Sequence, residues 1–355
     1  MGPMRENPRI LLVRTDRIGD VTLTTPAAAA LKAALPGARL HFLAGAYARP
    51  VLEKNPALER IITLGGFFDT LRELRRENYD AAVVFFVDFR SALLPLLAGI
   101  PLRVGPASKV WSLFLNRRIS QHRSRIEKHE ADYNRELLAG LGLPVTPAPT
   151  SVTVTPEEKD AAARALERAG LKPGDLIVGV HPGSRGSAMN WPPENFAALA
   201  SRLMRAHGVK VLLTGSAAET PLLEEMAAAM PEKPAVLREP LDLRHFMALV
   251  GRCSMFVTNS TGPLHLAVAQ GVPTLSFFPP IKVCSPRRWG PYGDGVNKVL
   301  VPSGPECLEC SREKCARFNC MAEITVEAAY AAAAEILAAG DAMRQGVPAA
   351  PGGPA

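Results

Sequence analysis

The feature that most constrains the fold is a strand–turn–helix unit at residues 255–273. The run from Met255 to Thr258 is short and apolar, which predicts a buried parallel strand. A turn of small polar residues follows, from Ser260 to Gly262. Pro263 suits the first position of a helix, because its missing N–H would be unpaired there in any case, and Gly271 is expected to end that helix. Such a unit is typical of an α/β domain with a parallel sheet.

The same turn is a candidate anion site. A helix N-terminus presents unpaired N–H groups and a partial positive charge, which attract phosphate. His265 lies about half a turn inside the predicted helix and could contact the same anion. We hypothesise that this turn binds the diphosphate of a nucleotide sugar. The alternative is an ordinary strand-to-helix turn that binds nothing.

Short apolar runs and helical segments alternate along the rest of the chain. In the first half, strands are predicted at 9–13, 39–44, 60–64 and 81–87, with helices at 21–35, 47–54, 68–77 and 91–97. In the second half, strands at 176–180, 209–213 and 274–277 join the one at 255–258, with helices at 194–207, 219–230, 243–251 and 325–339. This alternation predicts βαβ units, parallel sheets and ligand sites beyond the carboxyl ends of the strands.

The length and one linker predict two domains. The chain has 355 residues, and a domain typically takes about 100–200. Residues 143–156 contain four prolines and four threonines, a composition typical of a linker. We therefore expect two Rossmann-like α/β domains that face each other across a cleft, at residues 1–150 and 151–340. Residues 341–355 are rich in Pro, Gly and Ala and are expected to form a disordered tail.

The charge balance narrows the function classes only partly. A formal charge of +7 and a pI of about 9.2 fit an anionic substrate, a nucleic acid or an anionic membrane surface. No apolar run approaches the ~18–20 residues of a transmembrane helix. The polar start at residues 1–9 does not resemble a signal peptide, so a cytoplasmic enzyme is the default expectation.

Three further loops follow predicted strands and are candidate site segments. The loop at residues 15–20 places Asp20 at the start of a helix, where the alternative role is an N-cap. The loop at 181–192 combines small residues with Arg185, and the alternative is a flexible surface loop. The third segment, at residues 212–219, ends in Glu219, which is suited to bind ribose hydroxyls. Its alternative role is a first-turn acid favoured by the helix dipole.

Four segments, taken together, resemble glycosyltransferase family 9, the ADP-heptose:lipopolysaccharide heptosyltransferases. They are R-T-D-R-I-G-D-V-T-L-T-T-P, H-P-G-S with N-W-P, T-G-S-A-A-E, and N-S-T-G-P-L-H-L-A-V-A. The resemblance covers residues 9–339 in order. It implies a two-domain GT-B fold and an inverting, metal-independent transfer of L-glycero-D-manno-heptose from ADP-heptose to a lipopolysaccharide inner-core acceptor, with no catalytic cofactor.

The resemblance also implies roles for single residues. Asp20 matches the family's catalytic carboxylate and would act as general base toward an acceptor hydroxyl. Ser184 would lie beside the donor phosphates, Glu219 would bind the ribose, and Leu241 would lie against the adenine. The donor site expected from the motifs comprises Ser184, Arg185, Glu219, Leu241, Ser260, Thr261, Gly262 and His265.

Two positions depart from the family's pattern. Met189 stands where the family often has a phosphate-binding lysine, and Ser260 stands where it often has an aspartate. Arg185 is a candidate substitute for the lysine. These departures keep two alternatives open: a family 9 transferase that uses another nucleotide sugar, and a catalytically inactive nucleotide-sugar-binding protein.

Basic residues cluster between Arg117 and Lys128. The resemblance places the acceptor, a lipid A–Kdo or core oligosaccharide, on this half of the chain. The cluster would also attract anionic lipids, which predicts transient contact with the inner membrane. The alternative is a solvated charged loop, and nucleic acid is not expected because no aromatic residues alternate with the charges. The candidate acceptor-binding residues are Arg117, Arg118, Arg123 and Arg125.

Four cysteines form the last constellation. Cys307, Cys310, Cys315 and Cys320 have the spacing C-x2-C-x4-C-x4-C. Four nearby thiolates suit a tetrahedral zinc ion, and closed sites with four cysteine ligands are structural rather than catalytic. Two disulfides, an iron–sulfur cluster and four free thiols are the alternatives.

Overall fold

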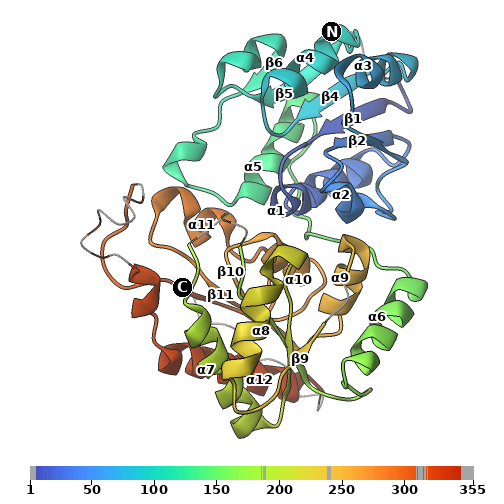
Figure 1. Cartoon of the computed structure of the whole chain (residues 1–355). Coiled ribbons are helices and arrows are strands. Elements are labelled where there is room, and N and C mark those ends of the chain that lie inside the picture. Colours follow the sequence, from blue (N-terminus) through green and yellow to red (C-terminus); the bar gives the residue numbers. More distant parts are fainter. Residues whose placement is uncertain are drawn as a thin grey trace. The chain divides into compact units, whose positions relative to one another are not determined.

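The computed structural model describes residues 5–184, 186, 189–237, 241–308, 310, 315, 317 and 319–344, with the backbone alone at 341–344. The chain divides into two compact units, unit 1 (Met1–Thr155) and unit 2 (Pro156–Ala355). Each unit contains a six-stranded parallel sheet flanked by helices (Figure 1), which confirms the predicted α/β class. Residues 345–355 of the expected tail lie outside the described residues.

Unit 1 is built on a sheet with the strand order β3-β2-β1-β4-β5-β6. Its strands are β1 (Arg9–Val13), β2 (Arg39–Ala44), β3 (Arg60–Thr63), β4 (Ala81–Val84), β5 (Leu102–Pro106) and β6 (Arg117–Ile119). Its helices are α1 (Ile18–Thr22), α2 (Thr25–Ala34), α3 (Phe67–Arg76), α4 (Phe89–Leu97) and α5 (Glu130–Glu136), with 3₁₀ turns η1 (Arg49–Leu52), η2 (Val110–Phe114), η3 (Arg123–Arg125) and η4 (Leu137–Leu141). The strand order reverses beside β1, and ligands of open α/β sheets bind at such switch points.

Unit 2 is built on a sheet with the strand order β12-β11-β10-β7-β8-β9. Its strands are β7 (Ile177–His181), β8 (Lys210–Leu213), β9 (Ala235–Val236), β10 (Met255–Asn259), β11 (Thr274–Phe277) and β12 (Asn297–Leu300). Its helices are α6 (Pro156–Arg168), α7 (Pro193–His207), α8 (Thr220–Ala229), α9 (Leu243–Val250), α10 (Gly262–Val268), α11 (Pro286–Trp289) and α12 (Val326–Arg344), with turns η5 (Ala217–Glu219), η6 (Lys282–Cys284) and η8 (Cys320–Glu323). The order reverses between β7 and β10, which is the switch point of this unit.

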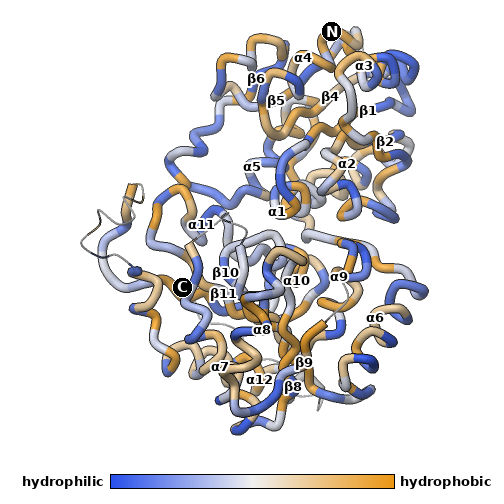
Figure 2. Tube along the Cα trace, viewed as in Figure 1, coloured by the Kyte–Doolittle hydropathy of each residue, from blue (hydrophilic) through white to orange (hydrophobic). Residues whose placement is uncertain are grey.

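Each unit has its own apolar core around its central strands. Parallel strands are covered on both faces and therefore consist of nearly continuous apolar residues. In unit 1, Val13 of β1 packs in one core cluster with Leu74 of α3 and Leu94 of α4. In unit 2, Val257 of β10 shares a core cluster with the fully buried Trp191. Figure 2 shows the apolar character of such strands, for example along β4.

The structure differs from the sequence-based prediction at the first helix and at one sheet edge. The predicted helix at 21–35 is two helices, α1 and α2, because Pro26 lies at the start of α2 and has no N–H to continue the helical hydrogen bonds of α1. The basic segment at 117–119, expected as loop, is the edge strand β6. Its three residues include two exposed arginines, and short charged strands are common at sheet edges.

No helix within the described ranges combines the length and the apolar character needed to cross a bilayer.

Candidate functional site

Asp20 lies beyond the carboxyl end of β1, in the first turn of α1. The N-cap of α1 is Arg17, so the N-cap role that the sequence left open for Asp20 is wrong. The Asp20 side chain is 16% exposed, and its Oδ1 accepts a hydrogen bond from Nη2 of Arg14 at 2.5 Å. The switch point of unit 1 therefore holds a mostly buried, ion-paired carboxylate.

Arg14 organises the acidic groups around Asp20. Its side chain is only 2% exposed and its Cζ lies 5.6 Å from the centroid of the Phe86 ring. Its Nε donates to Asp16 Oδ1 at 2.7 Å, and its Nη1 donates to Glu130 Oε1 at 3.0 Å. Burial opposes the positive charge of Arg14, but the three carboxylates outweigh burial and raise its pKa. Arg14 is therefore a permanent cation that holds the carboxylates in place.

Glu130 links this cluster to α5, 116 residues along the chain from Arg14. Its side chain is fully buried, and it also accepts a hydrogen bond from Arg123 Nη1 at 2.7 Å. One turn further along α5, Asn134 Nδ2 donates to the carbonyl of Leu23 at 3.0 Å. Two buried cations thus compensate Glu130, as a buried carboxylate requires.

The surroundings of Asp20 make it a stronger base than an ordinary aspartate. Burial raises the pKa of Asp20 to about 6, and the nearby Arg14 limits that rise. The negative charges of Asp16 and Glu130 add to the rise, because they disfavour a further negative charge. A carboxylate with such a pKa is mostly unprotonated at neutral pH and still accepts a proton readily, which suits a general base.

The four candidate acceptor arginines have different environments. Arg117 and Arg118 are exposed on β6, and Arg125 on η3 has a side chain that is 64% exposed. Arg123 differs, because its side chain is 11% exposed and is paired with Glu130. The first three present their charge to solvent, whereas Arg123 belongs to the buried cluster around Arg14.

In unit 2, three loops meet where neighbouring strands end. β7 lies between β10 and β8 in the sheet. Thr258 Oγ1 donates to the carbonyl of His181 at 3.1 Å, and Asn259 Nδ2 donates to the carbonyl of Pro182 at 2.7 Å. Toward β8, the neighbour of β7 opposite β10, His181 Nδ1 lies 3.1 Å from Oγ1 of Thr214, which follows β8. Six of the predicted donor residues lie on the loops or first turns after these strands: Ser184, Glu219, Ser260, Thr261, Gly262 and His265.

Glu219 lies directly against the loop that follows β7. A Cβ on Gly183 would come within 1.8 Å of Glu219 Oε1, so only glycine permits this approach. Glu219 Oε2 also accepts hydrogen bonds from the backbone N–H and the hydroxyl of Ser216, at 2.8 and 2.7 Å. The residue therefore has the structural role of a first-turn capping acid and also lies beside the predicted phosphate-binding loop.

The turn after β10 has the form that the sequence predicts. Thr261 is the N-cap of α10 and Gly262 is its first residue. The Thr261 hydroxyl donates to the carbonyl of Asn259 at 3.3 Å and does not cap the first-turn N–H groups. His265 follows inside the helix and is 6% exposed. Because α10 has only seven residues, its attraction for an anion comes mainly from these N–H groups.

Trp191 anchors the loop between β7 and α7. It is fully buried, stacks on Phe277 with centroids 4.1 Å apart, and meets Phe196 edge-on at 5.0 Å. Its Nε1 donates to the carbonyl of Ile324 at 2.8 Å, and its backbone N–H donates to Asn259 Oδ1 at 2.9 Å. Asn259, at the end of β10, therefore contacts both described ends of this loop, at Pro182 and at Trp191, while residues 185, 187 and 188 lie outside the described residues.

Two residues of the predicted donor set remain, Leu241 and Arg185, together with Met189 at the position where the family often has a lysine. Leu241 is half-buried, one residue before Asp242, the N-cap of α9. Met189 packs against the core of unit 2, so its position provides an apolar contact instead of a lysine's charge. Arg185 lies outside the described residues.

The cysteine loop shows no metal site in its described part. Cys307, Cys310, Cys315 and Cys320 are half-buried and are not joined by disulfides. Among the residues that the structure describes, no group of three or more His, Cys, Asp or Glu side chains could hold a metal ion. Residues 309, 311–314, 316 and 318 lie outside the described residues. Structural zinc therefore stays a prediction.

Sequence reasoning missed two members of the cluster around Asp20. Arg14 directly follows a buried strand, and that position alone could have marked it as part of the site. Glu130 had no such signal, because its contact with Arg14 spans 116 residues.

The chain is similar to proteins of known family and fold. The family model for "Glycosyltransferase family 9 (heptosyltransferase)" matches residues 68–320. A "Putative glycosyltransferase" of Haemophilus influenzae is 31% identical over 90% of this chain and 96% of its own length. Lipopolysaccharide heptosyltransferase 2 of Escherichia coli is 27% identical over 77% of this chain and 83% of its own length.

Solved structures extend the similarity to the fold. A family 9 glycosyl transferase from Veillonella parvula superposes with a TM-score of 0.81 at 24% identity, covering 94% of this chain and 99% of that one. The E. coli ADP-heptose lipopolysaccharide heptosyltransferase II superposes with a TM-score of 0.78 at 24% identity, covering 93% and 98%. The GT-B fold implied by the sequence resemblance is thereby confirmed.

Proposed function

The chain belongs to glycosyltransferase family 9, and we propose that it transfers heptose from ADP-L-glycero-D-manno-heptose to a lipopolysaccharide inner-core acceptor. Family membership makes it a glycosyltransferase. The observation that carries the catalytic part of the proposal is the buried Asp20 at the switch point of unit 1, whose pKa is raised to about 6. The similarity to lipopolysaccharide heptosyltransferase 2 of Escherichia coli supports heptose as the sugar.

Asp20 is the general base in this proposal. Its carboxylate takes the proton of an acceptor hydroxyl while that oxygen forms a bond to the anomeric carbon of the donor. The bond between this carbon and the diphosphate oxygen breaks in the same displacement, and ADP leaves with the electron pair. One displacement inverts the anomeric configuration. Arg14 holds Asp20 in place and keeps its pKa from rising further.

The donor binds to unit 2, at the carboxyl ends of β7, β8 and β10. The N–H groups at the start of α10 and the imidazole of His265 stabilise the negative charge that develops on the leaving diphosphate. Ser184 lies on the loop that Trp191 fixes and contributes a hydroxyl to the phosphates. Glu219 binds the ribose, Leu241 contacts the adenine, and Ser260 and Arg185 complete the donor site.

The acceptor binds to unit 1 through the exposed arginines 117, 118 and 125. Lipid A–Kdo carries phosphates and carboxylates, which guanidinium groups bind well. Arg123 contributes indirectly, because it compensates the charge of Glu130. In this proposal the enzyme works in the cytoplasm and contacts the inner membrane peripherally, where its lipid-anchored acceptor lies.

Acceptor-dependent release of ADP tests this function. Incubation with ADP-heptose and a Kdo-lipid A acceptor should release ADP, and release should stop without the acceptor. UDP-, GDP- and other ADP-sugars should be tested in parallel, because Met189 packs into the core where the family often has a lysine. Faster turnover of another nucleotide sugar would contradict the donor. Tight ADP binding without turnover of any donor would favour an inactive binding protein.

The pH dependence of activity should respond to Glu130. With Asp20 as base, kcat/KM should fall about tenfold per pH unit below a pH of about 6. The negative charge of Glu130 raises the pKa of Asp20, so Glu130→Gln should lower that pKa and move the acid limb to lower pH. Profiles of kcat/KM against pH measure the shift. Glu136→Gln, on the same helix but paired with Lys128, should leave the limb in place. A limb that does not move, or moves to higher pH, in Glu130→Gln would contradict the assignment.

A structural zinc ion in the cysteine loop is a further part of the proposal. Four thiolates from Cys307, Cys310, Cys315 and Cys320 would bind it tetrahedrally, and about one equivalent of zinc is expected in protein purified without chelator. A content below about a tenth of an equivalent would dispose of the site.

A further inference from the structure

Exposed apolar side chains are concentrated on three elements of unit 1. The described part of the chain exposes eleven large apolar side chains, and six of them lie on α3, α4 or η2. The most exposed of the six are Phe68 at 75%, Leu113 at 69% and Val110 at 65%. Single exposed apolar residues are normal, but a group of them marks an interaction surface. The six are Phe68, Phe89, Leu97, Val110, Trp111 and Leu113, and we call them the apolar face.

The three elements lie side by side over one face of the sheet of unit 1. Leu74 of α3, Leu94 of α4 and Leu115, which follows η2, pack in one core cluster. On the outer side, the ring centroids of Phe89 and Trp111 are 5.0 Å apart, which joins α4 to η2. Arg75 Nε donates to the carbonyl of Leu97 at 3.1 Å, which joins α3 to α4. The apolar face is therefore one surface rather than scattered residues.

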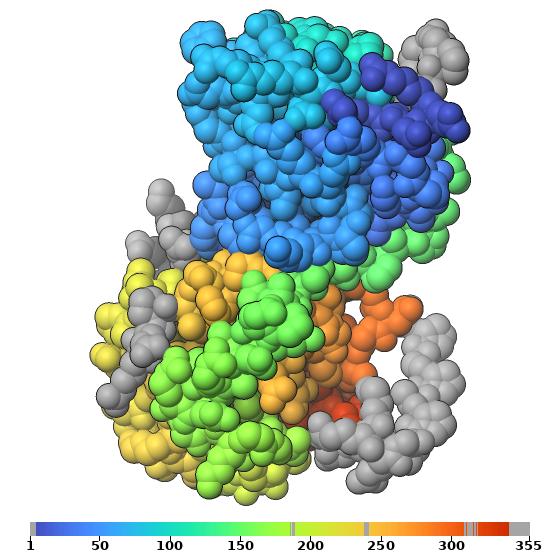
Figure 3. All heavy atoms as spheres, turned by 90° about the vertical axis from the view of Figure 1, so that its right-hand side faces the viewer, coloured from blue at the N-terminus to red at the C-terminus, as the bar shows by residue number. Residues whose placement is uncertain are grey.

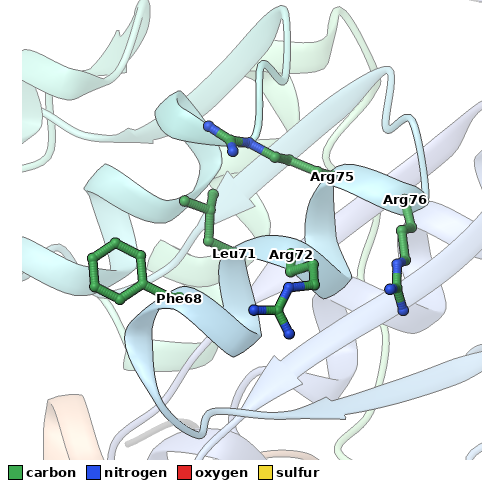
Figure 4. Close-up of a pocket in the computed structure, with 5 residues that line it drawn as sticks. All are labelled: Phe68, Leu71, Arg72, Arg75 and Arg76. Carbon is green, nitrogen blue, oxygen red and sulfur yellow. The ribbon is translucent and has the colours of Figure 1, made fainter.

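Helix α3 extends this surface with arginines. Figure 4 shows Phe68, Leu71, Arg72, Arg75 and Arg76 of α3, which line a pocket on this helix. All three arginines are exposed. Arg72 lies 3.3 Å from Asp69, also exposed, so this helix carries some negative charge as well. Figure 3 shows α3, in light blue, at the surface of unit 1.

The charge around α4 and η2 is strongly one-sided. Residues 89–126 contain seven Lys and Arg residues and no Asp or Glu, and four of the seven, Lys109, Arg117, Arg118 and Arg125, are exposed. Lys109 directly precedes the exposed Val110, and the exposed Arg117 and Arg118 follow η2 on β6. An apolar group bordered by cations matches a bilayer with anionic lipids, because apolar and aromatic side chains enter the headgroup region while the cations contact lipid phosphates.

We propose that the apolar face docks unit 1 onto an anionic lipid bilayer, with Val110, Trp111 and Leu113 inserted below the lipid phosphates. Arg117, Arg118 and the arginines of α3 contact the phosphates around them. The docking is independent of which sugar the enzyme transfers. It goes beyond attraction of the basic cluster to the membrane, because it assigns an apolar contact to named residues.

Tryptophan quenching by brominated lipids tests the insertion directly. The chain has three tryptophans, and Trp191 is fully buried in the core of unit 2. In full-length Trp289→Phe, Trp111 is therefore the accessible reporter. Vesicles of phosphatidylethanolamine and phosphatidylglycerol with brominated acyl chains should quench it and shift its emission to the blue. In Trp111→Phe, the remaining accessible tryptophan, Trp289, should be quenched little. Strong quenching in Trp111→Phe, or none in Trp289→Phe, would overturn the proposal.

Co-sedimentation with the same vesicles measures the apolar contribution. In the Trp289→Phe background, Val110→Ser with Leu113→Ser should weaken binding by at least about tenfold, because each substitution removes most of an apolar side chain from the bilayer. The matched control is Val283→Ser with Val301→Ser, which replaces exposed apolar residues of unit 2 and should bind normally. Thermal unfolding confirms that both variants are folded.

Two outcomes would assign the apolar face to another occupant. Equal vesicle binding by the Val110/Leu113 variant and its control would exclude the bilayer as occupant. A dimer in sedimentation velocity that this variant dissociates, without vesicle binding by the parent, would assign the face to a second copy of the chain. Replacing phosphatidylglycerol with neutral lipid should weaken binding of the parent, and unchanged binding would contradict the role of the cations.

Discussion

Replacing Asp20 with asparagine should lower acceptor-dependent ADP release by about 10²–10⁴-fold, the usual contribution of a general base. The amide has nearly the same shape but cannot take the acceptor proton. Affinity for ADP should be unchanged, because the proposed nucleotide site lies entirely in unit 2. Initial rates with saturating donor and acceptor, together with calorimetric titration of ADP, measure both effects.

Asp16→Asn is the matched control for this substitution. Asp16 is also paired with Arg14, through Nε at 2.7 Å, but it precedes α1 and is not the proposed base. Its replacement should lower activity much less, by no more than about tenfold. Equal losses in the two variants would mean that the cluster needs its negative charge rather than a base at Asp20. Near-normal turnover by Asp20→Asn would remove Asp20 from the chemistry altogether.

The largest effect on stability is expected from Trp191→Ala. Truncation of a fully buried tryptophan typically lowers the free energy of unfolding by roughly 3–5 kcal/mol. Here it removes the stacking on Phe277 and the contact with Phe196, and it leaves the carbonyl of Ile324 without its donor. Urea unfolding followed by circular dichroism measures the loss in unit 2.

Two controls separate packing from hydrogen bonding at this position. Trp191→Phe keeps an aromatic ring against Phe277 but loses the Nε1 donor to Ile324, so its loss should be clearly smaller than that of Trp191→Ala. Trp289→Ala, at a half-buried tryptophan of α11, should cost much less than Trp191→Ala. A Trp191→Ala protein as stable as the parent would contradict the anchoring role. The affinity of the Trp191→Ala variant for ADP should also fall, since the backbone N–H of Trp191 is bonded to Asn259 at the end of the segment that follows Ser184.

Apolar patterning predicted the central strands and failed at the sheet edge of unit 1. Residues 9–13 and 39–44 form β1 and β2 with the predicted bounds, because strands buried on both faces are continuous apolar runs. β5 contains an arginine, a glycine and a proline, and β6 consists of two arginines and an isoleucine. Both strands form because a neighbouring strand offers hydrogen bonds, and a local pattern does not contain that information.

In the candidate site, features set by short motifs were predictable from the sequence, and features set by contacts between distant residues were not. The turn at 260–262 was predictable, since it is a short motif between a strand and a helix. The basicity of Asp20 was not, because it arises from burial and from the negative charges of Asp16 and of Glu130, which lies on α5. Among the arginines, only the fold shows that Arg123 is paired with a buried carboxylate while Arg117 is exposed.

The stereochemistry of the product tests the central claim most directly. Wild-type enzyme should be supplied with ADP-heptose of defined anomeric configuration and a Kdo-lipid acceptor, and the new glycosidic linkage assigned by NMR. A single displacement assisted by Asp20 predicts the anomeric configuration opposite to that of the donor. Retention of configuration would contradict the account, because it would require a covalent intermediate or another path in which Asp20 is not simply the base.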